Sequence, residues 1–104
     1  MQRVAFKMHL LPGKTQEYKT RHDQIWPELV TLLKQSGIGD YYIYLDEETN
    51  MLFGTYLTTD LNTINKLPES PVMQKWWQYM ADIMESNSDH SPKSAPLQEM
   101  FYLA

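Results

Sequence analysis

Apolar side chains occupy every second position of residues 3–11: Val4, Phe6, Met8 and Leu10. The positions between them carry Arg3, Ala5, Lys7 and His9. A period of two predicts a β-strand with one buried face. The Pro12-Gly13 pair that follows predicts the end of this strand.

Between residues 14 and 35 the apolar period becomes that of a helix. At 100° per residue, one stripe contains Tyr18, His22, Ile25, Leu29, Leu32 and Leu33. His22 lies in the middle of this stripe and Trp26 on its shoulder. Pro27 falls inside the pattern, and proline donates no backbone hydrogen bond. We therefore expect one helix with a kink near residues 23–27.

Two β-rich runs follow, YYIYLD at residues 41–46 and MLFGTYLTT at residues 51–59. The polar stretch EETN separates them, which predicts a hairpin. Because side chains alternate along a strand, Tyr41 is expected on the face that the helices cover, whereas Tyr42 and Tyr44 share the other face.

A short helix is expected after Asp60. Ser70 and Pro71 then form a typical helix start, and the apolar pattern extends this second long helix to about Met84. A polar loop follows. The segment LQEMFYLA, residues 97–104, is predicted to be the last strand.

The element order is therefore β-α-β-β-α-β across residues 1–104, taken as one domain. This order is typical of the α+β class with a ferredoxin-like plait, in which a four-stranded antiparallel sheet carries both helices on one face. The open face of the sheet needs a cover. A second copy pressing its own sheet against it would provide one, so a homodimer is expected.

Composition narrows the choice of partners. The 104 residues include 13 acidic and 9 basic side chains, a formal net charge of −4, with no basic cluster. Nucleic acid and anionic membranes are therefore not expected as partners. The absence of cysteine excludes disulfides and thiolate chemistry. No apolar run approaches the roughly 20 residues of a membrane span, and the N-terminal stretch is unlike a signal peptide, so a cytoplasmic location is expected.

His22 is the main candidate for chemistry. A lone histidine on an apolar stripe is more often a structural residue than a catalyst. Burial next to hydroxyl groups would nevertheless suit it to general acid or base work near neutral pH. The other histidines, His9 and His90, lack metal-ligand spacing, and no glycine-rich phosphate loop or nucleophile elbow is present.

The adjacent Trp76 and Trp77 project about 100° apart on a helix, so only one of them can point straight into the core. The other is expected at the rim of a pocket, although core packing would explain either residue alone. The hydroxyl of Tyr41 needs a partner on the helix-covered face. Together with His22, these residues indicate a pocket for a small, neutral, polar ligand.

Several motifs, in this order, resemble the L-rhamnose mutarotase family over nearly the whole chain: EYKTRH, IWPEL, YYIYLD, MLFGTYL, QKWWQYM, NSDHSP and LQEMFYL. The resemblance implies a ferredoxin-like plait assembled as a dimeric α+β barrel. It implies that His22 is the proton donor, and that the substrate-binding residues are Tyr18, Tyr41, Trp76 and Trp77. The implied reaction exchanges the α and β anomers of L-rhamnose by ring opening, and it needs no metal or redox cofactor.

The chain departs from the family pattern at two places. Asp23-Gln24 follows His22 where Asn-Pro is frequent, which affects the charge near the imidazole, and His90 stands where Asn is common. Two other functions remain open from the residues: a cofactor-dependent monooxygenase or decyclase on the same fold, and a binding domain without catalysis.

Overall fold

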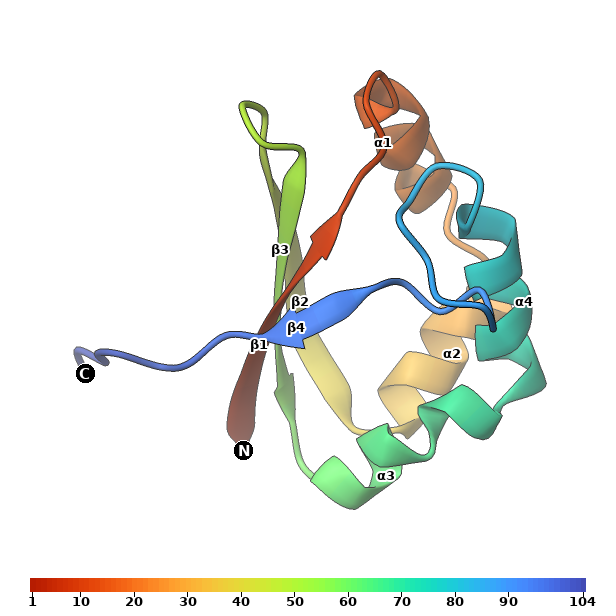
Figure 1. The fold of residues 1–104 in the computed structure, drawn as a ribbon. Helices are drawn as coiled ribbons and strands as arrows, with labels where there is room; N and C mark the ends of the chain where they lie inside the picture. The colour runs from red at the N-terminus through yellow and green to blue at the C-terminus, as the bar shows by residue number, and fades with distance from the viewer.

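A computed structural model describes all residues from 1 to 104. The chain forms a four-stranded antiparallel sheet with the helices gathered on one face (Figure 1). The strand order is β2-β3-β1-β4, which confirms the predicted ferredoxin-like plait. The elements are β1 (Gln2–His9), α1 (Thr15–Asp23), α2 (Pro27–Gln35), β2 (Ile38–Asp46), β3 (Met51–Thr58), α3 (Leu61–Asn65), the 3₁₀ turn η1 (Leu67–Glu69), α4 (Pro71–Met80) and β4 (Ser94–Pro96). None of the helices is long and apolar enough to cross a membrane.

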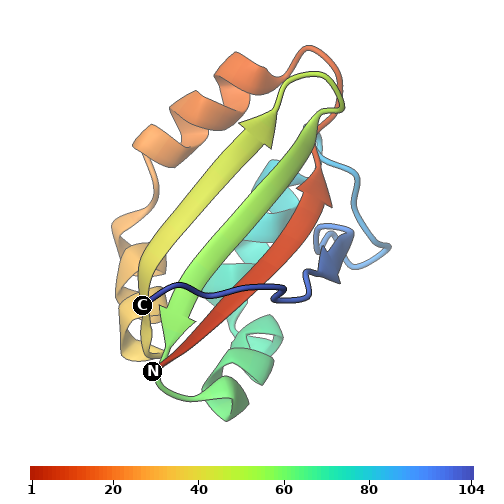
Figure 2. The same ribbon diagram turned by 90° about the vertical axis from the view of Figure 1, so that its left-hand side faces the viewer.

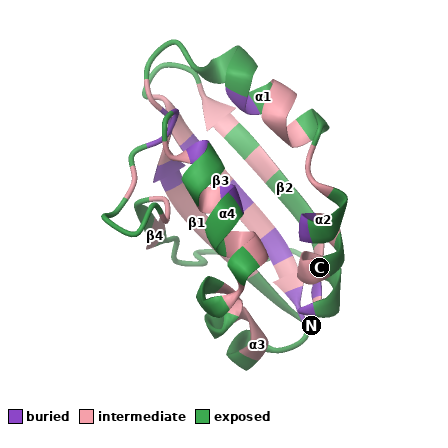
Figure 3. Ribbon diagram, turned by 90° about the vertical axis from the view of Figure 1, so that its right-hand side faces the viewer, coloured by how far each residue is buried: buried purple, intermediate pink, exposed green.

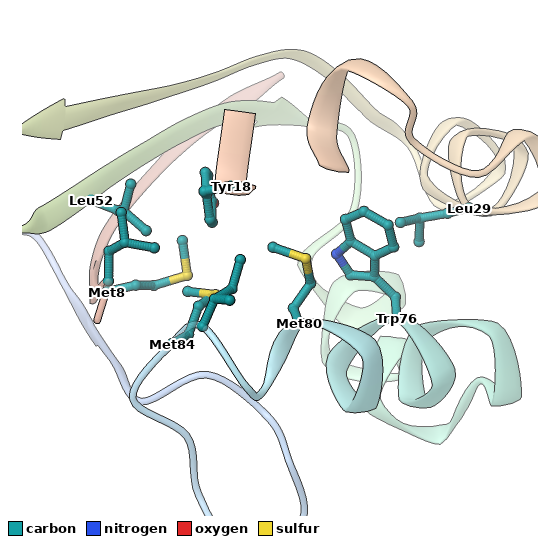
Figure 4. Packing of buried hydrophobic residues seen from close by; sticks show 9 residues of the cluster. Met8, Tyr18, Leu29, Leu52, Trp76, Met80 and Met84 are labelled. Carbon is teal, nitrogen blue, oxygen red and sulfur yellow. The ribbon is translucent and has the colours of Figure 1, made fainter. Parts of the chain in front are cut away.

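The core lies between the sheet and the helices, where the buried parts of the strands face α1, α2 and α4 (Figure 3). Figure 4 shows side chains from both layers meeting in this space. The buried cluster consists of Met8, Leu10, Tyr18, Leu29, Leu52, Trp76, Met80, Ile83 and Met84. Burying each large apolar side chain stabilises the fold by about 1.5–3 kcal/mol before entropy is counted. The predicted alternation of β1 is confirmed, because its apolar positions face this layer.

The expected single helix over residues 14–35 is wrong in one respect: the chain breaks into two helices instead of kinking. α1 ends at Asp23 and α2 begins at Pro27. Trp26, the residue before the proline, is extended, with φ −63° and ψ 132°. A residue before proline is pushed out of the helical region by the ring, and Pro27 is then well placed as the first residue of a new helix.

The second long helix also ends earlier than predicted, at Met80 instead of Met84. The next residues leave the helix because their backbone bonds to the end of β1. The Leu11 amide donates to the Ile83 carbonyl at 2.9 Å, and the Glu85 amide donates to the His9 carbonyl at 3.0 Å. Ile83 remains buried, so its apolar character reflects core packing outside the helix.

The last predicted strand, residues 97–104, is wrong. The fourth strand is instead Ser94–Pro96, which pairs with β1, and one further bond joins the Leu97 amide to the Ala5 carbonyl. Beyond it the tail extends away from the sheet on the face opposite the helices (Figures 1 and 2). Residues 100–103 are 74–84% exposed. Their apolar pattern resembles a strand, but within its own chain this segment has no partner strand.

A close approach of β1 and β3 shapes the interior. Gly54 lies opposite Phe6, whose ring covers it. A Cβ atom at position 54 would come within 2.4 Å of that ring. A larger residue would therefore displace Phe6, which lines the main cavity.

Candidate active site

The main cavity lies between the sheet and the helices and has a volume of about 750 Å³. That is large enough for a small molecule. Its wall is mostly apolar, because 22 of its 31 lining residues are hydrophobic. All five predicted site residues line it: Tyr18, His22, Tyr41, Trp76 and Trp77. The fold thus brings together residues from α1, β2 and α4 that lie far apart in the sequence.

His22 stands in the last turn of α1, and its Nδ1 atom lies 3.1 Å from the carbonyl oxygen of Tyr18. A carbonyl only accepts, so Nδ1 carries the proton and Nε2 has a free lone pair. No side-chain nitrogen or oxygen of the molecule is both buried and without a partner. Because Nε2 has no partner within the chain, it must be accessible, and His22 is one of the residues that line the cavity.

The surroundings of His22 keep its imidazole neutral. The ring stacks on Tyr18 at 4.2 Å and meets Trp76 edge-on at 5.5 Å. Burial lowers the pKa of His22 below its ordinary value, and this effect exceeds the opposing charge of Asp23. Asp23 is also paired with Lys19 on the exposed side of α1. The departure from the family pattern at Asp23 therefore does not reverse the direction of the shift.

Three phenols converge on the cavity. Tyr18 is buried, yet its hydroxyl bonds to no group of the chain, so it too must be accessible. The rings of Tyr41 and Tyr56 lie 5.1 Å apart, and Tyr41 also meets Phe6 edge-on at 6.3 Å. Burial raises the pKa of all three phenols. All three stay protonated at neutral pH and can donate hydrogen bonds.

Tyr56 is a cavity residue that the sequence reasoning missed. It lies on β3, on the same face as Leu52 and Gly54, and its side chain is buried. The alternation within residues 51–59 places it on the helix-covered face. A polar tip at such a position is the signal by which it could have been found.

The two adjacent tryptophans take different positions. Trp76 is buried and packs against Trp26 at 5.1 Å, while Trp77 is partly exposed. Figure 4 shows the indole nitrogen of Trp76 on the side of the ring that faces Tyr18 and Met80. Both tryptophans line the cavity. One packs into the core and the other lies nearer the surface.

His90 also lines the cavity, from the loop between α4 and β4. It is exposed and its φ is +71°, a conformation that non-glycine residues seldom adopt. The loop is held by the Asn87 amide, which donates to the Ser91 carbonyl at 2.8 Å. No group of three or more His, Asp or Glu side chains is arranged to bind a metal ion.

This arrangement is suited to proton transfer on a neutral, hydroxyl-rich molecule. One imidazole nitrogen can accept a proton, three phenols can donate hydrogen bonds, and two indoles offer flat apolar faces. An uncharged polar ligand with one apolar side would match such a wall.

Comparison with known proteins agrees with this chemistry. A family model described as L-rhamnose mutarotase matches residues 3–103. An L-rhamnose mutarotase of Sinorhizobium fredii is 57% identical over 104 residues, covering all of both chains. One from Jannaschia is 53% identical over 103 residues, covering 99% of each chain.

Solved structures give the same result. The crystal structure of an L-rhamnose mutarotase from Formosa agariphila matches with a TM-score of 0.94 and 48% identity, covering all of both chains. A protein from Mycobacterium tuberculosis, only 9% identical, has a TM-score of 0.58 and shares the fold alone. The family indicated by the sequence motifs is therefore confirmed, and the monooxygenase or decyclase alternative gains no support. The chain belongs to the L-rhamnose mutarotase family.

Proposed function

We propose that this protein interconverts the α and β anomers of L-rhamnopyranose, with His22 as the group that moves the proton. The observation that carries this proposal is the state of the His22 ring. Nδ1 is engaged by the Tyr18 carbonyl, and Nε2 is free beside a cavity lined with phenols and indoles. The identity of the sugar is inferred from membership of the family, and the catalytic role of His22 is inferred from the geometry of the site.

The reaction begins with a neutral imidazole, so Nε2 first accepts the proton of the anomeric hydroxyl O1–H. As the bond between C1 and the ring oxygen O5 breaks, the imidazolium gives that proton to O5, and an open-chain aldehyde remains. One nitrogen can reach both oxygens because both are bonded to C1. Rotation about C1–C2 and the reverse transfers then close the ring with the other configuration. Proton transfer of this kind contributes about 10²–10⁴-fold to a rate.

In this mechanism His22 is a base before it is an acid. The resemblance assigns it as a proton donor, and the Nδ1–H tautomer adds the step that precedes donation. The steps transfer only protons and break and re-form one C–O bond. No electron is transferred, so the chemistry calls for no redox cofactor.

The other cavity residues are proposed to hold the sugar. Tyr18 and Tyr41 donate hydrogen bonds to sugar hydroxyls, because their raised pKa values keep them protonated. Trp76 and Trp77 present apolar ring faces to the C–H face of the pyranose. The mostly apolar wall accommodates the methyl group of a 6-deoxy sugar, and it leaves the open-chain form free to rotate.

We also propose that the protein is a homodimer formed through the open face of the sheet. Tyr42 and Tyr44 stack on this face at 6.0 Å and are 51% and 60% exposed. The apolar tail of residues 97–104 stands off the same face (Figure 2), where a second copy would meet it. Sedimentation of wild type and of Phe101→Ser/Tyr102→Ser tests this point, because the double variant should shift toward monomer.

A cytoplasmic location and the absence of a nucleic-acid partner are proposed on composition. The net charge of −4 opposes binding to a polyanion, and a chain without cysteine has no disulfide to form outside the cell.

Saturation-transfer NMR on equilibrated L-rhamnose tests the reaction. The α-anomer H1 is irradiated and the β-anomer H1 is observed with wild type, with His22→Ala and without protein. His9→Ala is the matched control, since His9 lies on β1 outside the main cavity. We expect faster exchange with wild type and His9→Ala and none above background with His22→Ala. Retained exchange in His22→Ala would move the proton transfer to another group, and no exchange with wild type would reject the reaction.

A further inference from the structure

Strand β2 departs from regular pairing next to the cavity. Between Gly39 and Tyr42 the register with β3 shifts, so that Asp40 and Tyr41 together lie opposite Tyr56. Two residues facing one is a β-bulge. Asp40 has a φ of +50°, in the left-handed region that favours glycine. Bulges bend the strand and redirect the side chain that follows.

The bulge allows Tyr41 to lie on the same face of the sheet as Ile38. In a regular strand, residues separated by an odd number of positions lie on opposite faces. Ile38 and Tyr41 are three positions apart, yet Ile38 pairs with Thr58 and Tyr41 lies opposite Tyr56, and both of these β3 residues are on the buried face. The extra residue at position 40 makes this possible. With regular pairing continued from Ile38, Tyr41 would be on the outer face of the sheet and Tyr42 on the inner one.

An ion pair on the outer face holds the bulged residue. The Arg3 guanidinium lies 2.5 Å from the Asp40 carboxylate and donates a second bond to the Thr55 hydroxyl at 3.0 Å. Arg3 belongs to β1 and Asp40 to β2, which are separated by β3 in the sheet. The guanidinium therefore spans three strands and fixes the conformation of Asp40 from the side opposite the cavity.

We propose that Asp40, anchored by Arg3, is a positioning residue for the mutarotase reaction: its bulge holds Tyr41 in the cavity beside Tyr56. This inference rests on the proposed role of Tyr41 in binding the sugar. Asp40 touches no substrate. It affects the affinity for the sugar through the direction of the Tyr41 hydroxyl. Substitution of Asp40 should therefore change KM and not kcat.

The first test compares Asp40→Val with Asp40→Gly by polarimetry on freshly dissolved α-L-rhamnose. Valine strongly disfavours a positive φ, whereas glycine adopts it freely. Asp40→Val should raise KM about three- to tenfold, the effect of one lost neutral hydrogen bond, with kcat within about twofold of wild type. Asp40→Gly should keep KM within about twofold of the wild-type value.

Asn50→Val is the matched control, because Asn50 has a φ of +60° in the hairpin turn away from Tyr41. It should lower the melting temperature and leave KM unchanged.

The anchor is tested by combining variants. Arg3→Met should raise KM in the wild-type background and have no effect in Asp40→Gly, where no carboxylate remains to be held. Tyr41→Phe should raise KM to about the level of Asp40→Val, and the double variant should be no worse than either. The nuclear Overhauser effect between the rings of Tyr41 and Tyr56 should be lost in Asp40→Val and retained in Asp40→Gly.

Distinct results would overturn distinct claims. If Tyr41→Phe raises KM and Asp40→Val does not, the positioning role of Asp40 is wrong and the role of Tyr41 stands. If Tyr41→Phe leaves KM unchanged, the proposed binding role of Tyr41 is wrong, and this inference falls with it. If the KM of Asp40→Val rises only together with a change in sedimentation, the effect comes from subunit assembly and the inference is wrong. If Arg3→Met raises KM equally in the wild-type and Asp40→Gly backgrounds, the proposal that the ion pair anchors Asp40 is wrong.

Discussion

The Nδ1 atom of His22 donates a hydrogen bond to the backbone carbonyl of Tyr18 one helical turn earlier, at 3.1 Å, while the rings of the same two residues stack at 4.2 Å. The backbone bond selects the tautomer and the stacking fixes the ring plane. Both contacts are made between residues of α1, so the orientation of the imidazole depends on its own helix and not on contacts with the sheet. Only Nε2 remains for proton exchange with a ligand.

The rate of mutarotation should therefore fall in acid with the titration of His22. Burial places its pKa below the ordinary value of 6.5, so the base form persists down to pH values at which an exposed histidine is already protonated. We expect kcat/KM to be flat at neutral pH and to decline about tenfold per pH unit below a midpoint that lies under 6.5. Saturation-transfer NMR across pH 4.5–8 measures this profile. A midpoint above 6.5 would contradict the assigned environment.

The same titration should appear in stability. The folded pKa of His22 is lowered, so the unfolded chain binds the proton more readily, and stability is lost as pH falls from about 6.5 through the folded pKa. His22→Gln removes this titration. Urea melts of wild type and His22→Gln at pH 7.5 and pH 5 should give a smaller loss of unfolding free energy in acid for the variant. An equal loss would place the acid sensitivity in other groups.

Tyr56→Phe should weaken sugar binding without unfolding the protein. The ring contacts with Phe6 and Tyr41 are kept, and only the accessible hydroxyl is removed. The loss of one neutral hydrogen bond corresponds to about 0.5–1.5 kcal/mol, so KM should rise about three- to tenfold. Tyr42→Phe is the control, because Tyr42 lies on the outer face and should leave KM unchanged. An unchanged KM in Tyr56→Phe would show that its hydroxyl does not contact the sugar.

Alanine substitutions of the two adjacent tryptophans should have different effects on stability and on KM. Trp76 is 6% exposed and packs against Trp26 and His22, so Trp76→Ala should cost about 3–5 kcal/mol of unfolding free energy. Trp77 is partly exposed and lines the cavity. Trp77→Ala should leave most of the stability and raise KM. Chemical denaturation together with polarimetry distinguishes the two, and equal losses of stability would mean that both indoles belong to the core.

Sequence periodicity predicted the parts of the fold that depend on one element at a time. The period of two in β1 and the start of α4 at Pro71 follow from local chemistry, and both are confirmed. Pro27 predicts where the helical pattern is interrupted but not that it divides into two helices, because how far a helix bends at proline depends on what its two halves pack against. The strand predicted for residues 97–104 is wrong, since a strand needs a partner and the hydrophobic pattern does not say where that partner is.

Five residues of the candidate site were named from the sequence, and all five line the cavity. Tyr18 and His22 stand one turn apart, so their proximity follows from helix geometry. The inner face of Tyr41 follows from alternation along residues 41–46, but the bulge at Asp40 beside it does not, because an extra residue that shifts the register leaves no mark in composition. Tyr56 joins the group through the β2–β3 hairpin that the sequence predicts, but the hydrophobic pattern does not give the register that sets Tyr56 opposite Tyr41.

Arg21, the neighbour of His22, should be the main electrostatic link between α1 and the segment after α4. Its guanidinium bonds both carboxylate oxygens of Asp82, at 2.8 and 3.2 Å, and the carbonyl of Tyr79 at 2.7 Å. It also lies 4.5 Å from the centre of the Tyr79 ring, and its side chain is 11% exposed. Arg21→Met removes these bonds while keeping an apolar stem of similar length. We expect a loss of about 1–3 kcal/mol in unfolding free energy, measured by urea denaturation.

Arg21→Lys separates charge from geometry, because lysine keeps the positive charge and lacks the planar fork that engages both carboxylate oxygens. It should recover only part of the stability lost in Arg21→Met. Hydrogen bonding from Arg21 holds the pKa of Asp82 below its ordinary value of 3.8, so this contribution is present above that pH and is lost as pH falls through the folded pKa. Asp82 is 67% exposed, so solvent screens the pair and Asp82→Asn should cost less than Arg21→Met. Full recovery by lysine would show that charge alone, without the fork, joins α1 to this segment.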